Sequence, residues 1–314
     1  MLSVTFLGTS ASRPTVERGV SSIAIQREGE TMLFECGEGT QRQMMRYGVG
    51  FTLGEIFISH YHADHFLGLI GLVRTLGLQG REEKLHLYGP KGAKKVLGHA
   101  LEVGVEKAPF PVEIREVRPG EKLDRGPYLI EVIPVDHGRN AVGFALREHE
   151  RLGRFHPEKA KELGVPEGPL WGELHRGKPV EFDVTLDDGT TEHRIVRPND
   201  LVGPPRPGRL VVYSGDTRPC ESVVAAAEGA DLLIHEATFG EEEKERAVET
   251  DHATAVEAAQ VALAAGVKKL VLTHLSARYS MAPDVLLDEA KQVFPATTVA
   301  RDGMTIEVKF SDEG

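Results

Sequence analysis

The sequence predicts a layered α/β sandwich. In both halves of its 314 residues, short apolar runs typical of buried strands alternate with stretches of helical character. Several of these runs end in histidine or aspartate. In such architectures ligands collect at one edge of the sheet, outside the carboxyl ends of its strands. No short-period repeat interrupts the pattern, so we expect one domain over residues 1–314 with its chemistry gathered at one edge.

The first half is expected to open with three strands and a helix, followed by a histidine-rich loop. A glycine turn ends the first strand, and a charged turn at 27–30 separates the next two. The expected strands of this half are 4–9, 21–25, 31–37, 56–58, 85–90, 112–117, 129–135 and 142–146, and the expected helices are 42–47, 66–73 and 93–103.

The second half repeats the alternation after an interruption. Its expected strands are 210–217, 231–238 and 270–274, and its expected helices are 223–228, 252–265 and 284–294. Asp251 or Thr250 is available as the N-cap of the helix at 252–265.

Residues 147–209 interrupt the alternation. They are rich in glycine, proline and charge, they show few periodic apolar residues, and they hold the only tryptophan, Trp171. A long irregular segment in a compact domain usually has a function. We therefore expect a region inserted within the domain and protruding from it.

The bulk composition limits the partners. Lys and Arg number 37 against 48 Asp and Glu, so the net charge is −11, which argues against a nucleic-acid partner unless one face is locally basic. No apolar run is long enough to span a bilayer, and the N-terminus lacks a basic lead and a cleavage site, so we expect no membrane association. Only Cys36 and Cys220 occur, and reduced thiols fit a cytoplasmic protein.

The loop at 59–65 predicts a metal site. It reads Ser-His-Tyr-His-Ala-Asp-His and follows the apolar run 56–58. His60 and His62, two residues apart, can hold one cation, and Asp64 and His65 can reach a second. Imidazole and carboxylate are ligands that suit zinc, whose catalytic sites keep a position open for water.

Three further strand ends supply donors of the same kind, which brings the total to seven. We expect His60, His62 and His137 to hold the first metal, Asp64, His65 and His274 to hold the second, and Asp216 to bridge the two.

This donor set predicts a hydrolase. Two neighbouring cations lower the pKa of a shared water and clamp an in-line displacement at phosphorus. Asp64 is the candidate to take the proton, and His252 with Glu236 could form a relay that protonates the leaving oxygen. Glu35 is expected to accept a hydrogen bond from a ligating imidazole, and His235 is interpreted as structural. The remaining histidines are interpreted as surface or packing residues: His86, His99, His149, His156, His175 and His193.

Several motifs beyond the metal loop carry a family resemblance. They read Phe-Glu-Cys-Gly-Glu-Gly-Thr-Gln at 34–41, Ser-Gly-Asp-Thr-Arg-Pro at 214–219, His-Glu-Ala-Thr-Phe at 235–239, Asp-His-Ala-Thr at 251–254 and Thr-His-Leu-Ser-Ala-Arg-Tyr at 273–279. With the metal loop they resemble the metallo-β-lactamase superfamily and, within it, the short ribonuclease Z family of tRNA 3′-processing endonucleases, over essentially the whole chain.

The resemblance implies a four-layer αββα metallo-β-lactamase sandwich with two Zn²⁺ per subunit, Mn²⁺ being possible. It further implies a zinc-dependent endoribonuclease. Such an enzyme cuts precursor tRNA after the discriminator nucleotide and leaves a 3′-hydroxyl on the tRNA and a 5′-phosphate on the trailer.

The inserted region also finds a counterpart in that family. Residues 164–171, followed by Gly177, resemble the Gly-Pro-containing flexible arm that grips the tRNA, which places the arm at about 150–180 and implies a homodimer.

Two positions depart from the family pattern. Glu35 stands where Asp is usual, which puts the geometry of its contact in question, and Gly19 stands where Asn is common, near the cleavage point.

Three alternatives stay open. A phosphodiesterase or lactone hydrolase acting on small molecules would use the same metals but would have no use for the arm. A non-catalytic RNA-binding relative would have lost ligands, and none is missing here. A β-lactamase often has Cys among its second-metal ligands, where this chain offers Asp216.

Overall fold

The structure, a computed structural model, describes residues 1–104, 107–186 and 188–311 and divides the chain into two compact units. The first unit contains residues 1–147 and 209–309. The second contains residues 148–208 together with the C-terminal end from Phe310. Each unit has a hydrophobic core of its own.

The first unit is built on two seven-stranded sheets. The first sheet has the strand order β16-β1-β2-β3-β4-β5-β6, in which β3 to β6 run parallel. Its strands are β1 (Leu2–Gly8), β2 (Ser22–Arg27), β3 (Glu30–Phe34), β4 (Leu53–Phe57), β5 (Leu85–Gly89), β6 (Val112–Glu116) and β16 (Thr305–Glu307).

The second sheet has the order β15-β14-β13-β12-β9-β8-β7, and β12 to β15 run parallel. Its strands are β7 (Lys122–Asp124), β8 (Tyr128–Pro134), β9 (Val142–Glu148), β12 (Leu210–Tyr213), β13 (Leu232–Glu236), β14 (Leu270–Thr273) and β15 (Thr297–Val299).

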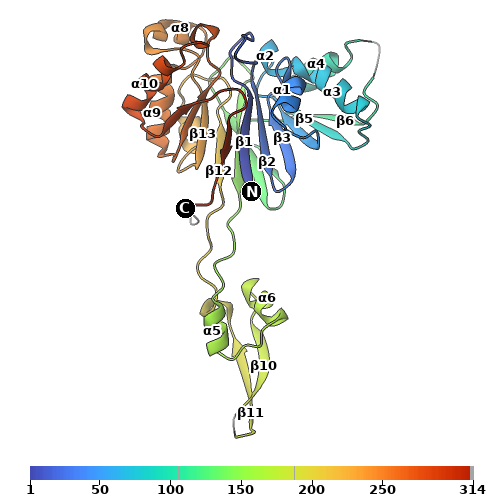
Figure 1. The fold of residues 1–314 in the computed structure, drawn as a ribbon, viewed down its shortest axis with the longest axis vertical. Helices are drawn as coiled ribbons and strands as arrows, with labels where there is room; N and C mark the ends of the chain where they lie inside the picture. Colours follow the sequence, from blue (N-terminus) through green and yellow to red (C-terminus); the bar gives the residue numbers. More distant parts are fainter. Residues whose placement is uncertain (105–106, 187, 312–314) are drawn as a thin grey trace. The chain divides into compact units, whose positions relative to one another are not determined.

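The sheets pack face to face, and helices cover their outer faces. The core between the sheets holds Phe34, Phe57, Phe144 and Tyr213, with Phe34 and Phe57 stacked at a ring-centroid distance of 5.1 Å. Separate apolar clusters join each sheet to its helices, α1, α3 and α4 on one side and α7, α9 and α10 on the other (Figure 1). The helices are α1 (Thr40–Arg46), α2 (Ala63–Phe66), α3 (Gly68–Leu78), α4 (Ala93–Leu101), α7 (Glu221–Ala226), α8 (Lys244–Glu249), α9 (Ala255–Ala265) and α10 (Asp284–Val293). The predicted αββα sandwich is therefore confirmed.

The second unit is more regular than the sequence suggested. It contains α5 (Pro157–Glu162), α6 (Pro169–His175) and a hairpin of β10 (Val180–Thr185) and β11 (Thr191–Val196). Leu174, Val180 and Leu201 belong to its buried cluster, against which Trp171 packs. The expectation of an irregular segment is wrong, because elements of six or seven residues are too short to show a clear apolar period.

Two predicted helices begin three residues away from the expected start, one earlier and one later. The expected helix at 66–73 is divided into α2, which starts three residues earlier, and α3. The helix expected at 252–265 begins at Ala255, because Thr254 caps it: the Thr254 hydroxyl accepts from Glu257 N, and the Glu257 carboxylate accepts from Thr254 N at 2.9 Å. His252 therefore lies in the loop before α9, and neither Thr250 nor Asp251 is the cap.

No helix within the described ranges has both the length and the apolar character needed to cross a membrane.

Candidate metal centre

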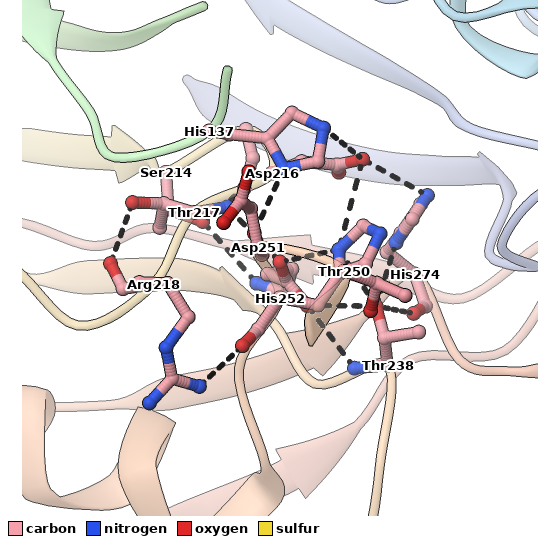
Figure 2. Close-up of polar contacts among 12 residues, drawn as sticks. His137, Ser214, Asp216, Thr217, Arg218, Thr238, Thr250, Asp251, His252 and His274 are labelled. Atoms are coloured by element: carbon pink, nitrogen blue, oxygen red, sulfur yellow. Dashed lines mark hydrogen bonds and ion pairs between the residues drawn. The ribbon is translucent and has the colours of Figure 1, made fainter. Parts of the chain in front are cut away.

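Chain segments that follow β4, β8, β12 and β14 bring the predicted donors together. The metal loop follows β4, and His62 is the N-cap residue of α2, so Asp64 and His65 lie in the first turn of that short helix. His137, Asp216 and His274 arrive from the segments after β8, β12 and β14 (Figure 2). All seven predicted donors lie in two groups whose ligand atoms are within 4.8 Å of one another.

The first group contains His60, His62, His137 and Asp216. His60 Nε2 lies 2.9 Å from His62 Nδ1, and His137 Nε2 lies 3.4 Å from the same atom. Three ring nitrogens therefore converge on one small volume. Such crowding suits lone pairs that share a cation better than it suits three separate polar side chains.

The second group contains Asp64, His65 and His274. Asp64 Oδ2 lies 3.5 Å from His65 Nε2 and 3.3 Å from His274 Nε2. These rings are almost completely buried, whereas Asp64 keeps a small exposed area. The carboxylate therefore lies at the solvent side of this group.

Asp216 Oδ2 lies between the two groups. It is 3.5 Å from His60 Nε2, 3.3 Å from His65 Nε2 and 3.4 Å from His274 Nε2. Burial opposes the charge on this carboxylate, but the imidazoles of His274 and His65 outweigh burial and hold the pKa of Asp216 well below its ordinary range. An ionised carboxylate at the junction of the groups is the arrangement expected of a bridging ligand.

The opposite ring nitrogens of the histidines are engaged by the surrounding protein. His60 Nδ1 lies 2.9 Å from Ser59 Oγ, His137 Nδ1 lies 2.8 Å from the carbonyl oxygen of Asp251, and His274 Nδ1 lies 2.9 Å from Thr238 Oγ1. Partners of this kind orient the ring and direct the other nitrogen at a metal. The sequence did not point to the Asp251 carbonyl, because a backbone atom leaves no signal in residue type.

Glu35 occupies the expected place next to His65. Its Oε1 lies 3.4 Å from His65 Nδ1, and it also accepts a hydrogen bond from Ser59 N. Glu35 has a φ of 64°, in the left-handed region. The longer side chain therefore reaches the imidazole at an ion-pair distance, but the expected hydrogen bond is not formed.

His252 and Glu236 lie at the edge of the same cluster. His252 Nδ1 is 2.8 Å from Glu236 Oε1 and 4.0 Å from Asp216 Oδ2. Burial opposes a charge on the His252 ring, but Glu236 outweighs burial and raises the pKa of His252 to about 9. Glu236 is held in turn by Thr217 N at 3.0 Å and Thr238 Oγ1 at 2.7 Å.

One contact was not anticipated from the sequence. Ser12, in the loop after β1, donates its backbone N–H to Asp64 Oδ2 at 2.7 Å and has a φ of 61°. A non-glycine residue in the left-handed region is uncommon and is found at functional sites. The N-terminal loop thus fixes the carboxylate that the sequence singled out.

The donor set fits a metal on grounds independent of any relative. In the part of the chain that the structure describes, His65 Nε2 and Asp216 Oδ1 are buried without a hydrogen-bond partner. Buried polar atoms in native proteins are nearly always satisfied, and each unsatisfied one requires an explanation. Cations held by these residues provide one, so the clusters are suited to metal binding.

Family models match two parts of the chain. Residues 2–145 match the model described as anti-Pycsar protein Apyc1, and residues 201–275 match the beta-lactamase superfamily domain. Neither match covers half of the chain.

Full-length relatives are more informative. The chain is 55% identical over 314 residues to the ribonuclease Z of Gemmatimonas aurantiaca, covering 99% of this chain and 98% of that one. It is 45% identical to the ribonuclease Z of Methanosarcina acetivorans, with both chains covered completely.

Solved structures agree on the fold. The human short-form tRNase Z superimposes with a TM-score of 0.70 at 26% identity, covering 98% of this chain and all of that one. The metallo-β-lactamase-fold protein YhfI from Bacillus subtilis gives a TM-score of 0.67 at 22% identity, covering 97% and 98% of the two chains. The second likeness bears on the fold alone.

Proposed function

The chain belongs to the ribonuclease Z family, and on that premise we propose that it is a zinc-dependent endoribonuclease that removes the 3′ trailer from precursor tRNA. The cut would follow the discriminator nucleotide and leave a 3′-hydroxyl on the tRNA and a 5′-phosphate on the trailer. The observation that carries the proposal is the position of Asp216 Oδ2, within 3.5 Å of imidazole nitrogens from both donor groups.

Two zinc ions would be held by the seven donors. His60, His62 and His137 would bind one ion, Asp64, His65 and His274 the other, and Asp216 both. Imidazole-rich sets of this kind favour zinc, and Mn²⁺ is the second candidate. When bound, such a pair supplies Lewis-acid stabilisation of the charge that develops at the phosphodiester and promotes ionisation of the attacking water.

Asp64 would accept the proton of the attacking water. The carboxylate lies at the solvent side of its group, and the hydrogen bond from Ser12 N fixes its orientation. A positioned base must lie within hydrogen-bond reach of the proton that it accepts. As the new oxygen–phosphorus bond forms, the bond from phosphorus to the 3′-oxygen of the discriminator ribose breaks.

His252 would donate a proton to that leaving 3′-oxygen. Its Nδ1 is engaged by Glu236, so Nε2 is the nitrogen available to the substrate. Glu236 would orient the ring and stabilise its charged form, and the hydrogen bonds from Thr217 and Thr238 hold Glu236 in place.

The second unit is proposed to grip the body of the tRNA, and the active protein is proposed to be a homodimer. The unit has its own buried cluster, which supports independent folding of the region that resembles the family's arm. The two free cysteines suit a reducing compartment, and the proposed site of action is the cytoplasm.

The direct test is cleavage of a precursor tRNA by the zinc-loaded protein, with the cut mapped to the nucleotide. A cut after the discriminator supports the proposal. Turnover of bis-p-nitrophenyl phosphate without tRNA cleavage would instead support the small-molecule phosphodiesterase, which uses the same donor set.

A further inference from the structure

A groove next to the metal centre is lined by an excess of positive charge. Its volume is about 830 Å³. We call it the basic groove, and the cationic residues that line it are Lys91, Lys94, Arg115, Arg118 and Arg139. Its anionic lining residues are Glu113 and Glu116. A chain with a net charge of −11 therefore has a locally basic surface.

The cations come from three segments of the first unit. Lys91 and Lys94 lie just before and in the first turn of α4, Arg118 follows β6, and Arg139 lies in the loop between β8 and β9. All four side chains are exposed, and within the described residues none of them forms an ion pair. They therefore carry charge that is available to a ligand.

Both acidic residues of the groove already form polar contacts within the protein. Glu113 pairs with Lys84 Nζ at 2.9 Å, and Glu116 Oε1 accepts a hydrogen bond from Gly92 N at 2.9 Å. Among the described residues, only one of the five cations has an ion-pair partner, since Arg115 pairs with Glu121. Five cationic side chains against two carboxylates leave the lining with an excess of positive charge, which favours an anion.

The basic groove leads to the metal centre. A hollow of about 460 Å³, lined by His60, His62 and His137, shares Arg139 and Asn140 with it. Tyr61, between the first two of these histidines, donates its hydroxyl hydrogen to the carbonyl oxygen of Pro90 at 2.5 Å. Pro90 lines the basic groove, so this hydrogen bond connects the metal loop to the wall of the groove.

We propose that the basic groove binds the phosphate backbone of the single-stranded 3′ trailer. This inference rests on the proposed function. Proteins that bind single strands without sequence preference guide the backbone along a positively charged groove and add aromatic side chains on which bases stack. No aromatic side chain is among the described residues that line this groove. The groove would therefore contact the phosphates of the trailer and not stack on its bases.

The trailer is the part of the substrate that suits this geometry. On the tRNA side of the cut, the acceptor duplex begins one nucleotide away, whereas the trailer continues as a single strand. The groove is walled by the start of α4 and by β6, the edge strand of the first sheet, and the trailer would enter it as a single strand. Phosphate contacts position a nucleic acid without reading its sequence, which suits a product of variable sequence.

The test compares the double variant Lys91→Gln/Lys94→Gln with Lys95→Gln as matched control. Lys95 is exposed on the same helix but does not line the groove. Kinetics would be measured on precursor tRNAs that carry a one-nucleotide or a ten-nucleotide uridine trailer, between about 50 and 200 mM salt. Turnover of bis-p-nitrophenyl phosphate reports on the metal centre.

For the long trailer, KM of the double variant should rise about tenfold at unchanged kcat. The salt dependence should weaken by about 1.4 units of log–log slope, because two charges are removed. The short-trailer substrate and the small diester should be cleaved as by wild type. Equal losses on both trailers would place the contact on the acceptor stem and overturn the proposal, as would a double variant that behaves like Lys95→Gln. Failure of wild type to cut either tRNA would instead contradict the proposed function.

Discussion

Arg218 and Glu257 form a bidentate ion pair next to the metal centre. Arg218 Nη1 donates to Glu257 Oε2 at 2.8 Å and Nη2 donates to Oε1 at 2.5 Å. Arg218 Nη1 also donates to the carbonyl oxygen of His252, a contact that Figure 2 shows. The backbone N–H of Arg218 donates to the carbonyl oxygen of Asp136. One residue thus connects α9 to the segments that carry His137 and His252, so we expect Arg218 to be a positioning residue.

Replacing Arg218 by Gln should lower kcat for tRNA cleavage about tenfold or more while KM and zinc content stay near wild type. The His252 loop loses its anchor, whereas His60 and His274 keep partners that lie outside this loop. The stability cost should be about 3 kcal/mol, because Glu257 is left as a buried unpaired charge. Steady-state kinetics, zinc analysis and thermal unfolding provide the readouts.

Lys268→Gln is the matched control, since it breaks an ion pair with Asp231 at the surface of the same unit. That change should cost under about 1 kcal/mol and leave kcat unchanged. Arg218→Lys should restore stability in part and kcat incompletely, because Lys cannot form the bidentate contact. Loss of zinc together with activity in Arg218→Gln would contradict a positioning role.

Asp216→Asn should remove most of the bound zinc. The change keeps the shape of the side chain but removes the charge that five imidazoles face, and a metal-bridging role requires an ionised carboxylate. We expect the zinc content to fall below about one ion per subunit and cleavage to fall by at least about a thousandfold. Elemental analysis of dialysed protein measures the first effect.

Asp288→Asn, at an exposed position of α10, controls for the substitution itself and should retain full zinc. Unaltered zinc content in a folded Asp216→Asn protein would show that this carboxylate is not the bridge.

Gly68 permits the close contact that positions the metal loop. A Cβ at this residue would lie 1.9 Å from the carbonyl oxygen of Gly37, a backbone atom that cannot move away cheaply. Gly68→Ala should therefore destabilise the protein by about 2 kcal/mol or more and weaken zinc binding, because the start of α3 must shift away from the loop at Gly37. Thermal unfolding of zinc-loaded and zinc-free protein separates the two effects.

Gly98, in the interior of α4, offers the opposite case as a control. The nearest atom to a Cβ there is Ile114 Cδ1 at 4.0 Å, an ordinary contact distance. Gly98→Ala should stabilise the protein by about 0.5–1 kcal/mol, since alanine loses less conformational entropy in a helix than glycine does. A Gly68→Ala protein as stable as Gly98→Ala would refute the packing described here.

The two thiols should differ sharply in reactivity. Burial raises the pKa of the Cys36 thiol to about 12, and its side chain is fully buried. At pH 8 only about one molecule in ten thousand would hold that thiolate, whereas Cys220 is partly exposed. Iodoacetamide should modify Cys220 alone in native protein and both residues in denaturant, as read by mass spectrometry. Modification of Cys36 before unfolding would contradict its burial.

The donor set could be predicted from the sequence because each donor follows a strand that is recognisable locally. The apolar runs before His60, Asp216 and His274 can each be recognised as strands from the local sequence. The α/β architecture then brings the ends of these strands together at one edge of the sheet. The roles of these residues in catalysis remain predictions.

Features that depend on residues far apart in the chain could not be predicted from local sequence patterns. The Ser12 contact depends on a backbone N–H brought to Asp64 from 52 positions away. The short strands β15 and β16 gain their stability from pairing with β14 and β1, which no local pattern reveals. The predicted start of α9 was wrong because it relied on Asp251 or Thr250 as the N-cap, although Thr254 with Glu257 forms a capping box visible in the sequence.

The second unit can be removed at a defined point. Arg151 and Arg206 face each other in an antiparallel bridge, with Arg151 N donating to the Arg206 carbonyl at 2.7 Å and the reverse bond at 2.9 Å. Residues 152–205 can therefore be replaced by Asn-Gly, a two-residue connection that suits opposed antiparallel strands. This cut removes the whole buried cluster of the unit and leaves no half of it exposed.

The shortened protein should keep zinc and its turnover of bis-p-nitrophenyl phosphate but lose tRNA cleavage by about a hundredfold or more, mainly through KM, because contacts remote from the scissile bond bind the substrate. A second variant, Trp171→Ala, should weaken the unit without removing it, because the indole packs against the buried cluster and donates to the Val165 carbonyl at 3.1 Å. Its loss of tRNA cleavage should be smaller than that of the deletion. If both proteins cut precursor tRNA like wild type, the second unit has no part in substrate binding.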